Sequence, residues 1–412
     1  MAKKTKVESS GGSIFDIINS VDNGCELIEQ SAGAKINEYI STGSYILNAA
    51  ITGSMFKGIP CGRITTLAGE PGAGKSFLAL SVCREAQKSG YVPIYLDSEG
   101  AQDIQTVTRL GVDTKKFMIK QVNTITEIST FILNLCTKLE AIPEENRDKI
   151  IIVLDSLGNL TSNKEADDIL NATGKRDMTK QQEIKALFRV CSTPLAKLHI
   201  PFIVVSHVYQ TQDLFSKTVV SGGSGIGFSS SVTLMLSAAK LNGNDKDNDK
   251  AAENAKGELM KTGVIVSARP SKSRFTIPQK VSFYIPFFKA PNPYVGLDQY
   301  MTWENSGIGK GKCYTQKEYE KLKPSEQECC VSFEFDGETR YALLKDSARN
   351  IVVSHLGCDI PINELFTPKV FTEEFMKKFD EEVIRPSFEL PDQSKWDNDD
   401  ELVSELIDEV EE

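Results

Sequence analysis

A lysine and a serine follow a glycine-rich turn at a spacing that suits phosphate binding. Residues 69–76 read Gly-Glu-Pro-Gly-Ala-Gly-Lys-Ser, which fits glycine, four free positions, glycine, lysine, then serine or threonine. Backbone N–H groups of glycine can face a phosphate without interference from Cβ. Lys75 can reach the β- and γ-phosphates of a nucleotide, and the Ser76 hydroxyl can bind Mg²⁺. The alternative is a glycine-rich loop with an exposed lysine. The residues expected to hold the nucleotide are Gly69, Glu70, Pro71, Gly72, Ala73, Gly74, Lys75, Ser76 and Phe77.

Acidic residues end two apolar runs further along the chain. Asp97-Ser98-Glu99 follows residues 91–96, and Asp155 follows the aliphatic residues 150–154. The carboxyl end of a central strand is where an open α/β sheet binds its ligand. We expect Glu99 to orient or deprotonate a water that attacks the γ-phosphate. Asp155 is expected to hold the Mg²⁺ shell, often through water. Helix capping by Asp97 or Glu99 is the alternative.

His207 ends a third apolar run at residues 201–206. The same position at a strand end favours a functional role for it, and a structural role is equally compatible with the sequence. The next residues, 208–230, are expected to form a mobile loop with two aromatic side chains. Exposed aromatics in a cationic loop stack on bases, whereas the alternative is a lid over the nucleotide. A first mobile loop is expected at residues 161–181, which are mostly polar.

The elements that must position these residues alternate along the chain. Strands are expected at residues 64–68, 91–97, 117–122, 150–155, 201–207, 231–237, 262–268 and 280–286. Helices are expected at residues 45–50, 77–86, 127–141 and 178–198. Such alternation predicts an α/β fold with a mostly parallel sheet flanked by helices. The low-complexity insert 241–261 is expected to be a disordered hairpin tip.

Three cations lie within six residues, at Arg269, Lys272 and Arg274. They form either a phosphate-binding turn or a solvated turn. From about residue 287 the pattern changes to proline, aromatics and short elements, so we expect a domain boundary there. Near the start, apolar residues in 14–21 predict a short helix that packs either on its own domain or on a neighbouring subunit.

Charge is unevenly distributed along the 412 residues. The formal net charge is −10, and residues 397–412 contain nine acidic and no basic residues, so the rest is nearly neutral and can carry a basic groove. No apolar run approaches the roughly 18 residues of a membrane span, and no signal-peptide core follows the basic N-terminus. The nine cysteines include no C-x-x-C pair, which favours a reducing cytoplasm and argues against zinc.

Several motifs in order resemble the RecA recombinases. They are Ser-Thr-Gly-Ser at 41–44, the phosphate loop at 69–76, Asp-Ser-Glu at 97–99, Arg-Leu-Gly-Val-Asp at 109–113 and Leu-Asp-Ser-Leu-Gly-Asn-Leu at 154–160. The segment beginning His-Val-Tyr-Gln-Thr-Gln at 207 is similar to the second DNA loop of the T4-type phage recombinases (UvsX type). The resemblance covers residues 35–290. It implies a RecA-like phosphate-loop ATPase core, a short N-terminal oligomerisation segment and a small C-terminal α/β domain.

The resemblance also implies roles in catalysis. Lys272 and Arg274 match the pair that reaches the γ-phosphate bound by the neighbouring subunit, with Arg269 as the alternative. His207 stands where bacterial relatives have a glutamine that senses the γ-phosphate and connects to the DNA loop. Asp103 matches an adenine contact. ATP and Mg²⁺ are the implied cofactors, with Lys75 and Glu99 among the catalytic residues.

The resemblance implies that two loops meet DNA. The residues expected to do so are Lys175, Arg176, Met178, Phe215 and Lys217. The cations would contact backbone phosphates, and Met178 and Phe215 would wedge or stack against bases.

The implied function is ATP-dependent strand exchange by a helical filament on single-stranded DNA that pairs with homologous duplex DNA, in the cytoplasm of a host cell if phage-encoded. A single-strand-binding protein and a loader are expected partners. The alternatives are a hexameric helicase on the same core and a nucleotide-bound scaffold without turnover. The expected parts are residues 1–34, the core 35–288, a C-terminal domain 289–395 and an acidic tail 396–412.

Overall fold

The computed structural model describes residues 18, 21, 25, 27–29, 31, 33–170, 179–210, 218–238, 252–253, 259–260, 263–287 and 289–389. The expected DNA-contacting residues Lys175, Arg176, Met178, Phe215 and Lys217 lie outside this part of the chain, as does the acidic tail.

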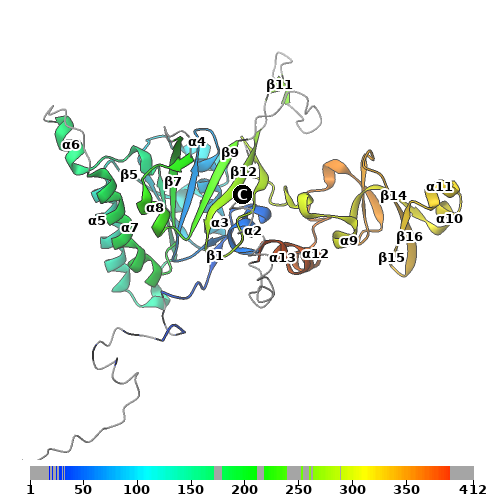
Figure 1. The fold of residues 1–412 in the computed structure, drawn as a ribbon, viewed down its shortest axis with the longest axis horizontal. Helices are drawn as coiled ribbons and strands as arrows, with labels where there is room; N and C mark the ends of the chain where they lie inside the picture. Colours follow the sequence, from blue (N-terminus) through cyan, green and yellow to red (C-terminus); the bar gives the residue numbers. More distant parts are fainter. Residues whose placement is uncertain are drawn as a thin grey trace, which may run out of the picture.

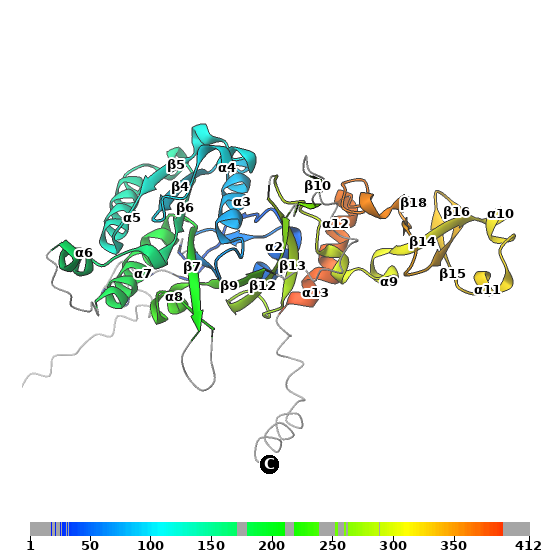
Figure 2. The same ribbon diagram turned by 90° about the horizontal axis from the view of Figure 1, so that it is seen from above.

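One large sheet forms the centre of the molecule (Figures 1 and 2). Its strand order is β13-β12-β9-β3-β7-β6-β4-β5, with β8 paired to β7. The strands from β9 to β5 in this order are parallel to their neighbours, and β12 is antiparallel to both β9 and β13. The bounds are β3 (Ile64–Gly69), β4 (Val92–Asp97), β5 (Met118–Gln121), β6 (Ile150–Asp155), β7 (Phe202–Gln210), β8 (Thr218–Val220), β9 (Val232–Ala238), β12 (Gly263–Ser273) and β13 (Val281–Pro286). The predicted α/β fold and mostly parallel sheet are confirmed.

Alternate residues of the strands pack on two separate layers of helices. Ile151 and Val153 of β6 join the core that contains α2 (Tyr45–Thr52) and α3 (Lys75–Lys88). Ile152 and Leu154 of the same strand join the core under α5 (Ile125–Glu140) and α7 (Lys180–Lys197). The period of two in a strand therefore fixes which helix layer each strand-end residue faces. The remaining helices of the core are α4 (Ile104–Arg109), α6 (Asn163–Leu170) and α8 (Ser224–Ser229).

Residues 208–230 differ from the single mobile loop that we predicted. Residues 208–210 extend β7 and pair antiparallel with 218–220 of β8, and residues 224–229 form α8. The β-branched residues Val208, Thr218, Val219 and Val220 favour this strand pairing. Only residues 211–217 of the loop fall outside the described chain. The segment is thus a hairpin whose stem is part of the central sheet.

The cationic segment 269–274 is also more regular than predicted. β12 continues to Ser273, so Arg269 and Lys272 are strand residues, and the interpretation as a turn is wrong. A register shift interrupts the pairing with β9 between Pro270 and Lys272 because proline has no N–H to donate. In the insert 241–261, the described residues pair as β10 (Ala252–Glu253) and β11 (Leu259–Met260).

A second sheet follows the core and lies beside it at the end away from α5 (Figures 1 and 2). Its strand order is β15-β16-β14-β17-β18. Its bounds are β14 (Ile308–Thr315), β15 (Cys330–Phe335), β16 (Glu338–Leu344), β17 (Asn350–Val353) and β18 (Cys358–Pro361), with short helices α9 (Trp303–Ser306), α10 (Gln316–Tyr319) and α11 (Pro324–Gln327).

The last helices, α12 (Glu373–Phe379) and α13 (Arg385–Phe388), return to the core. Asp380 between them is fully buried and accepts hydrogen bonds from Ser54 Oγ (2.9 Å) and Met55 N (2.6 Å) of the core. Within the described ranges, no helix is long and apolar enough to cross a membrane.

Candidate nucleotide site

The carboxyl ends of four parallel strands bring the predicted site residues together. In the register of the sheet, Asp97 of β4 lies opposite Asp155 of β6, and Gly69 of β3 lies opposite His207 of β7. Alternate residues of a strand share one face of the sheet. Asp155 therefore faces the same layer as Ile151 and Val153 of β6, and His207 faces the same layer as Ile203 and Val205 of β7. That layer holds α3. One polar site therefore forms at the start of α3.

The phosphate loop joins β3 to α3. Gly72 and Gly74 have φ values of 78° and 80°, a region that favours glycine. A Cβ on Gly74 would also approach Ile285 Cδ1 to 2.5 Å. Lys75 Nζ donates to the carbonyl oxygens of Gly69 (3.0 Å) and Glu70 (2.8 Å), so its ammonium lies over the loop. Burial lowers the pKa of Lys75, and the carboxylates of Asp155 and Glu99 oppose that shift.

Asp155 presents one free oxygen in this site. Its Oδ2 accepts a hydrogen bond from the Tyr95 hydroxyl at 2.5 Å, whereas its Oδ1 is buried without a hydrogen-bond partner among the described residues. Burial raises the pKa of Asp155, and the hydroxyls of Tyr95 and Ser76 oppose the shift.

A hard cation would suit that free oxygen. The part of the chain that the structure describes has no cluster of three or more His, Cys, Asp or Glu residues that could hold a metal ion by themselves. Mg²⁺ typically takes one or two carboxylates and completes its shell with phosphates and waters. Asp155 with Ser76 fits that limited set of protein ligands.

Glu99 is held by hydrogen bonds at the edge of the site. Ser156 Oγ donates to Glu99 Oε1 at 2.7 Å, and His207 Nε2 lies 3.4 Å from the same oxygen. Ser98 fixes Ser156 in turn, because its hydroxyl accepts from Ser156 N (2.8 Å) and donates to Ser156 O (2.7 Å). These hydrogen bonds hold the Glu99 carboxylate beside the strand ends that carry Asp155 and His207.

The two neighbouring aspartates have local structural partners. Asp97 Oδ1 accepts from the N–H groups of Glu99 and Gly100, both at 2.9 Å, so Asp97 holds the turn that carries Glu99. Capping of a helix by Asp97 or Glu99 is therefore not observed. Asp103 is the residue that caps α4, accepting from Gln105 N (2.8 Å) and Thr106 N (3.0 Å). Its predicted contact with adenine stays a prediction.

His207 connects the site to the β7–β8 hairpin. Its backbone oxygen accepts from Ser221 N at 2.7 Å, just after β8 ends. Three residues after His207, β7 ends at Gln210, and the segment 211–217 follows. The side chain of His207 thus contacts Glu99, whereas its backbone belongs to the stem of the hairpin.

Lys272 and Arg274 do not reach this site. Lys272 lies opposite Thr233 of β9, which lies opposite Thr66 near the middle of β3, away from the phosphate loop. Lys272 Nζ donates to the carbonyl oxygens of Gly227 (2.7 Å) and Phe228 (3.0 Å) at the end of α8. Burial and the charge of Arg274 lower the pKa of Lys272.

The position of Arg274 agrees with that of Lys272. Arg274 lines a groove of about 780 Å³ together with Arg63 and Ile64, the residues at which β3 begins. Both cations therefore lie toward the amino-terminal edge of the parallel strands. Arg269, the alternative, is an exposed residue that lies opposite Met235 and thus nearer the phosphate-loop edge.

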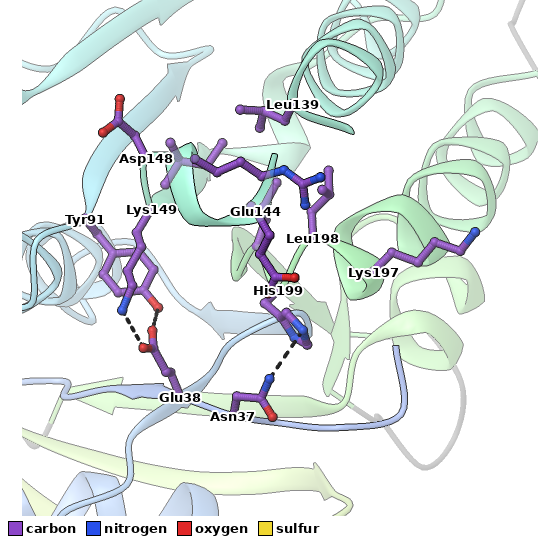
Figure 3. Close-up of a pocket in the computed structure, with 13 residues that line it drawn as sticks. Asn37, Glu38, Tyr91, Leu139, Glu144, Asp148, Lys149, Lys197, Leu198 and His199 are labelled. Carbon is purple, nitrogen blue, oxygen red and sulfur yellow. Dashed lines mark hydrogen bonds and ion pairs between the residues drawn. The ribbon is translucent and has the colours of Figure 1, made fainter. Parts of the chain in front are cut away.

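A cavity of about 220 Å³ also lies at the amino-terminal edge (Figure 3). Lys149 and Tyr91 both donate to Glu38, and Asn37 lies 3.4 Å from His199 Nε2. The Glu38 carboxylate is thus already paired, which assigns it to holding the strand β1 (Tyr39–Ile40) against the start of β4.

Tyr95, Ser98 and Ser156 belong to the site, although no sequence pattern indicated Tyr95 or Ser156. Tyr95 and Asp155, whose side chains form a hydrogen bond, are 60 residues apart in the sequence. The one available signal was strand parity, since Tyr95 precedes Asp97 by two residues and so shares its face.

The sheet order, the glycine-rich turn and the acids at the strand ends define a phosphate-loop α/β protein. The family model of the RecA N-terminal domain matches residues 21–275. The chain belongs to the RecA N-terminal domain family.

Individual relatives agree with this assignment. The chain is 29% identical over 256 residues to the recombination and repair protein of Enterobacteria phage T4, covering 61% of this chain and 60% of that protein. It is 29% identical over 212 residues to the protein RecA of Helicobacter hepaticus, covering 50% and 57%, respectively. A RecA of Helicobacter pylori is 36% identical over 128 residues, covering 31% and 34%. The chain thus matches about 60% or less of the length of these relatives.

Proposed function

We propose that this protein is a DNA strand-exchange recombinase that hydrolyses ATP and assembles as a helical filament on single-stranded DNA. The filament would pair that strand with homologous duplex DNA in recombination, repair and recombination-dependent replication. The family assignment and the similarity to a recombination and repair protein support this function.

The nucleotide site would work by positioning and charge. Residues 69–77 would hold the phosphates of ATP, and Asp103 would contact the adenine. Ser76 and Asp155 would hold Mg²⁺, which supplies charge neutralisation at the phosphates when bound. Glu99, held by Ser156 and His207, would orient the water that attacks the γ-phosphorus and accept its proton.

The observation that carries the proposal is the placement of Lys272 and Arg274 at the edge of the sheet opposite to their own phosphate loop. Charge that develops on a transferring phosphoryl group needs nearby cations. If these two supply it, they must act on the nucleotide of a neighbouring subunit. A contact between opposite edges of identical subunits is heterologous, and repetition of such a contact produces a ring or a helical filament.

DNA would bind beside the nucleotide. The β7–β8 hairpin starts at His207, which also faces Glu99, so the hairpin has a direct connection to the position that activates water. Phe215 and Lys217, between β7 and β8 in the sequence, and Lys175, Arg176 and Met178, after α6 in the sequence, would contact the strand. Stacking and backbone contacts are tolerant of sequence, as a recombinase requires.

The ends of the chain would serve assembly. The described apolar residues Ile18 and Val21 are 40% and 83% exposed, which favours packing on a neighbouring subunit over packing on their own core. We assign residues 1–34 to that contact, 35–288 to the ATPase core, 289–395 to a C-terminal domain and 396–412 to an acidic tail. A single-strand-binding protein and a loader are the proposed partners on DNA.

Electron microscopy of the protein with single-stranded DNA and a slowly hydrolysed ATP analogue tests this function, together with an assay of D-loop formation. We expect helical filaments and D-loops that require both nucleotide and homology. Closed rings that unwind duplex DNA would contradict the proposal and favour a hexameric helicase.

A further inference from the structure

We infer that Tyr95 is a positioning residue of the magnesium–nucleotide site, because its hydroxyl holds one oxygen of Asp155, whereas the other has no donor among the described residues and would be available to Mg²⁺ or its water shell. The inference rests on the proposed role of Asp155 at Mg²⁺. It assigns a function to a buried tyrosine hydroxyl that forms hydrogen bonds with Asp155 and Gln102.

The packing of Tyr95 fixes the position of its hydroxyl. Its side chain is fully buried in the core under α3 and packs on Phe117, with ring centroids 5.6 Å apart. Tyr95 lies opposite Val153 of β6, two residues before Asp155, so the two side chains are diagonal neighbours on one face of the sheet. Because the ring is enclosed, its hydroxyl has a fixed place from which it donates to Asp155 Oδ2 at 2.5 Å.

The two oxygens of Asp155 are then distinct. Oδ2 has a donor, and the buried Oδ1 has none among the described residues. A carboxylate fixed by one strong donor cannot rotate freely, so only Oδ1 is presented to a cation or to a metal-bound water.

A second hydrogen bond orients the tyrosine hydroxyl itself. Gln102 Nε2 donates to Tyr95 Oη at 3.2 Å, so the hydroxyl accepts from Gln102 and donates to Asp155. Gln102 precedes Asp103, the residue that caps α4. The series Gln102–Tyr95–Asp155 therefore links the loop after Glu99 to the metal-facing aspartate.

A phenylalanine would fill the same space and remove only this donor. Asp155 Oδ2 would then be a buried carboxylate oxygen without a partner, and the carboxylate could turn away from its metal-facing orientation. Partners of this kind, one shell outside the metal ligands, commonly change metal affinity by about 10- to 100-fold.

The test is a Mg²⁺ titration of nucleotide affinity in the full-length protein, with a fluorescent ADP derivative as the probe. For Tyr95→Phe we expect the Mg²⁺ concentration at half of the affinity gain to rise about tenfold. Affinity measured in EDTA should stay within about twofold of the parent protein, because the phosphate loop is untouched.

Tyr91→Phe is the matched control. Tyr91 is also buried and donates its hydroxyl to a carboxylate, that of Glu38, but it lies at the opposite edge of the sheet. This variant should leave the Mg²⁺ dependence unchanged. Gln102→Leu, which removes only the outer hydrogen bond, should shift the Mg²⁺ midpoint in the same direction by about threefold.

Two results would overturn the inference while leaving the nucleotide site intact. One is an unchanged Mg²⁺ midpoint in both Tyr95→Phe and Gln102→Leu. The other is a loss of affinity in Tyr95→Phe that is equal with and without Mg²⁺. A parent protein that binds no nucleotide at all would instead refute the proposed function, and the inference with it.

Discussion

Lys75 and Lys272 lie at opposite edges of one sheet. Lys75 begins α3 at the carboxyl end of β3, whereas Lys272 is bound to the carbonyl oxygens of Gly227 and Phe228 near the amino end of that strand. The two lysines therefore cannot act on one nucleotide within one subunit. This separation is the reason why we propose a site that two subunits share.

Removing a shared-site cation should separate binding from turnover. In Lys272→Ala or Arg274→Ala, nucleotide affinity should stay within about twofold, because the phosphate loop is complete in each subunit. DNA-stimulated hydrolysis should fall by about 10³-fold, the lower range for a cation supplied in trans. Steady-state hydrolysis with single-stranded DNA measures this loss.

Arg269→Ala is the control on the same strand, since its side chain is exposed and it lies on the other side of the register shift at Pro270. It should hydrolyse ATP at the parent rate. If Arg269→Ala alone lost activity, the trans role would belong to Arg269 instead.

Ser156→Ala should affect Glu99, the carboxylate that we propose to activate water. The variant removes the 2.7 Å hydrogen bond to Glu99 Oε1, so Glu99 would lose its fixed orientation. We expect kcat to fall by about tenfold at unchanged nucleotide affinity, as a hydrogen bond to a charged group contributes about 1.5–3 kcal/mol. An unchanged kcat would mean that His207 alone orients Glu99.

Glu38 should make the free energy of unfolding depend on pH in the acid range. Hydrogen bonds from Lys149 and Tyr91 lower the pKa of Glu38 in the folded protein. The resulting stability is present above the unfolded-state pKa and is lost as pH falls through the lower folded-state pKa. Because the side chain is 44% exposed, screening should keep the contribution under about 1 kcal/mol.

Thermal unfolding of Glu38→Gln across that acid range measures the contribution. The variant should melt below the parent near neutral pH and approach it as the solution is acidified. Parallel melting curves at every pH would contradict this role of Glu38.

Asp380 should hold the C-terminal helices on the core. Its buried carboxylate accepts from Ser54, Met55 and Arg385 Nε (2.9 Å). Asp380→Asn places an amide donor against these donors, so the free energy of unfolding should fall by about 1–3 kcal/mol. Glu382→Gln is the control, because its ion pair with Lys378 is 3.8 Å long and exposed. Equal denaturation midpoints of the two variants would refute the assignment.

The main site residues could be predicted because each follows a continuous signal. The strands that end in Asp97 and Asp155, and the part of β7 that leads to His207, read as apolar runs, and the phosphate loop is one eight-residue pattern. Parallel strands bring their carboxyl ends to one edge, so the convergence of these residues followed from the fold class.

Contacts between distant residues could not be predicted in the same way. Asp380 meets Ser54 across 326 positions, and Tyr95 meets Asp155 across 60. The prediction from local composition was also wrong at 208–230. Glycine and polar residues there indicated one loop, but the β-branched residues of 218–220 pair with the end of β7. Tertiary pairing decided the conformation there.

Mixing two inactive variants tests the shared site most directly. Glu99→Gln lacks the water-activating carboxylate but keeps Lys272, and Lys272→Ala has the reverse defect. In a mixed filament on single-stranded DNA, a Lys272→Ala subunit can supply the phosphate loop and Glu99, and its neighbour, a Glu99→Gln subunit, can supply Lys272. An interface of this kind has all the groups of the proposed site. We expect an equal mixture to regain about a quarter of the parent hydrolysis rate, since random heterologous contacts complete one interface in four. A mixture as inactive as each variant alone would contradict a site shared between subunits.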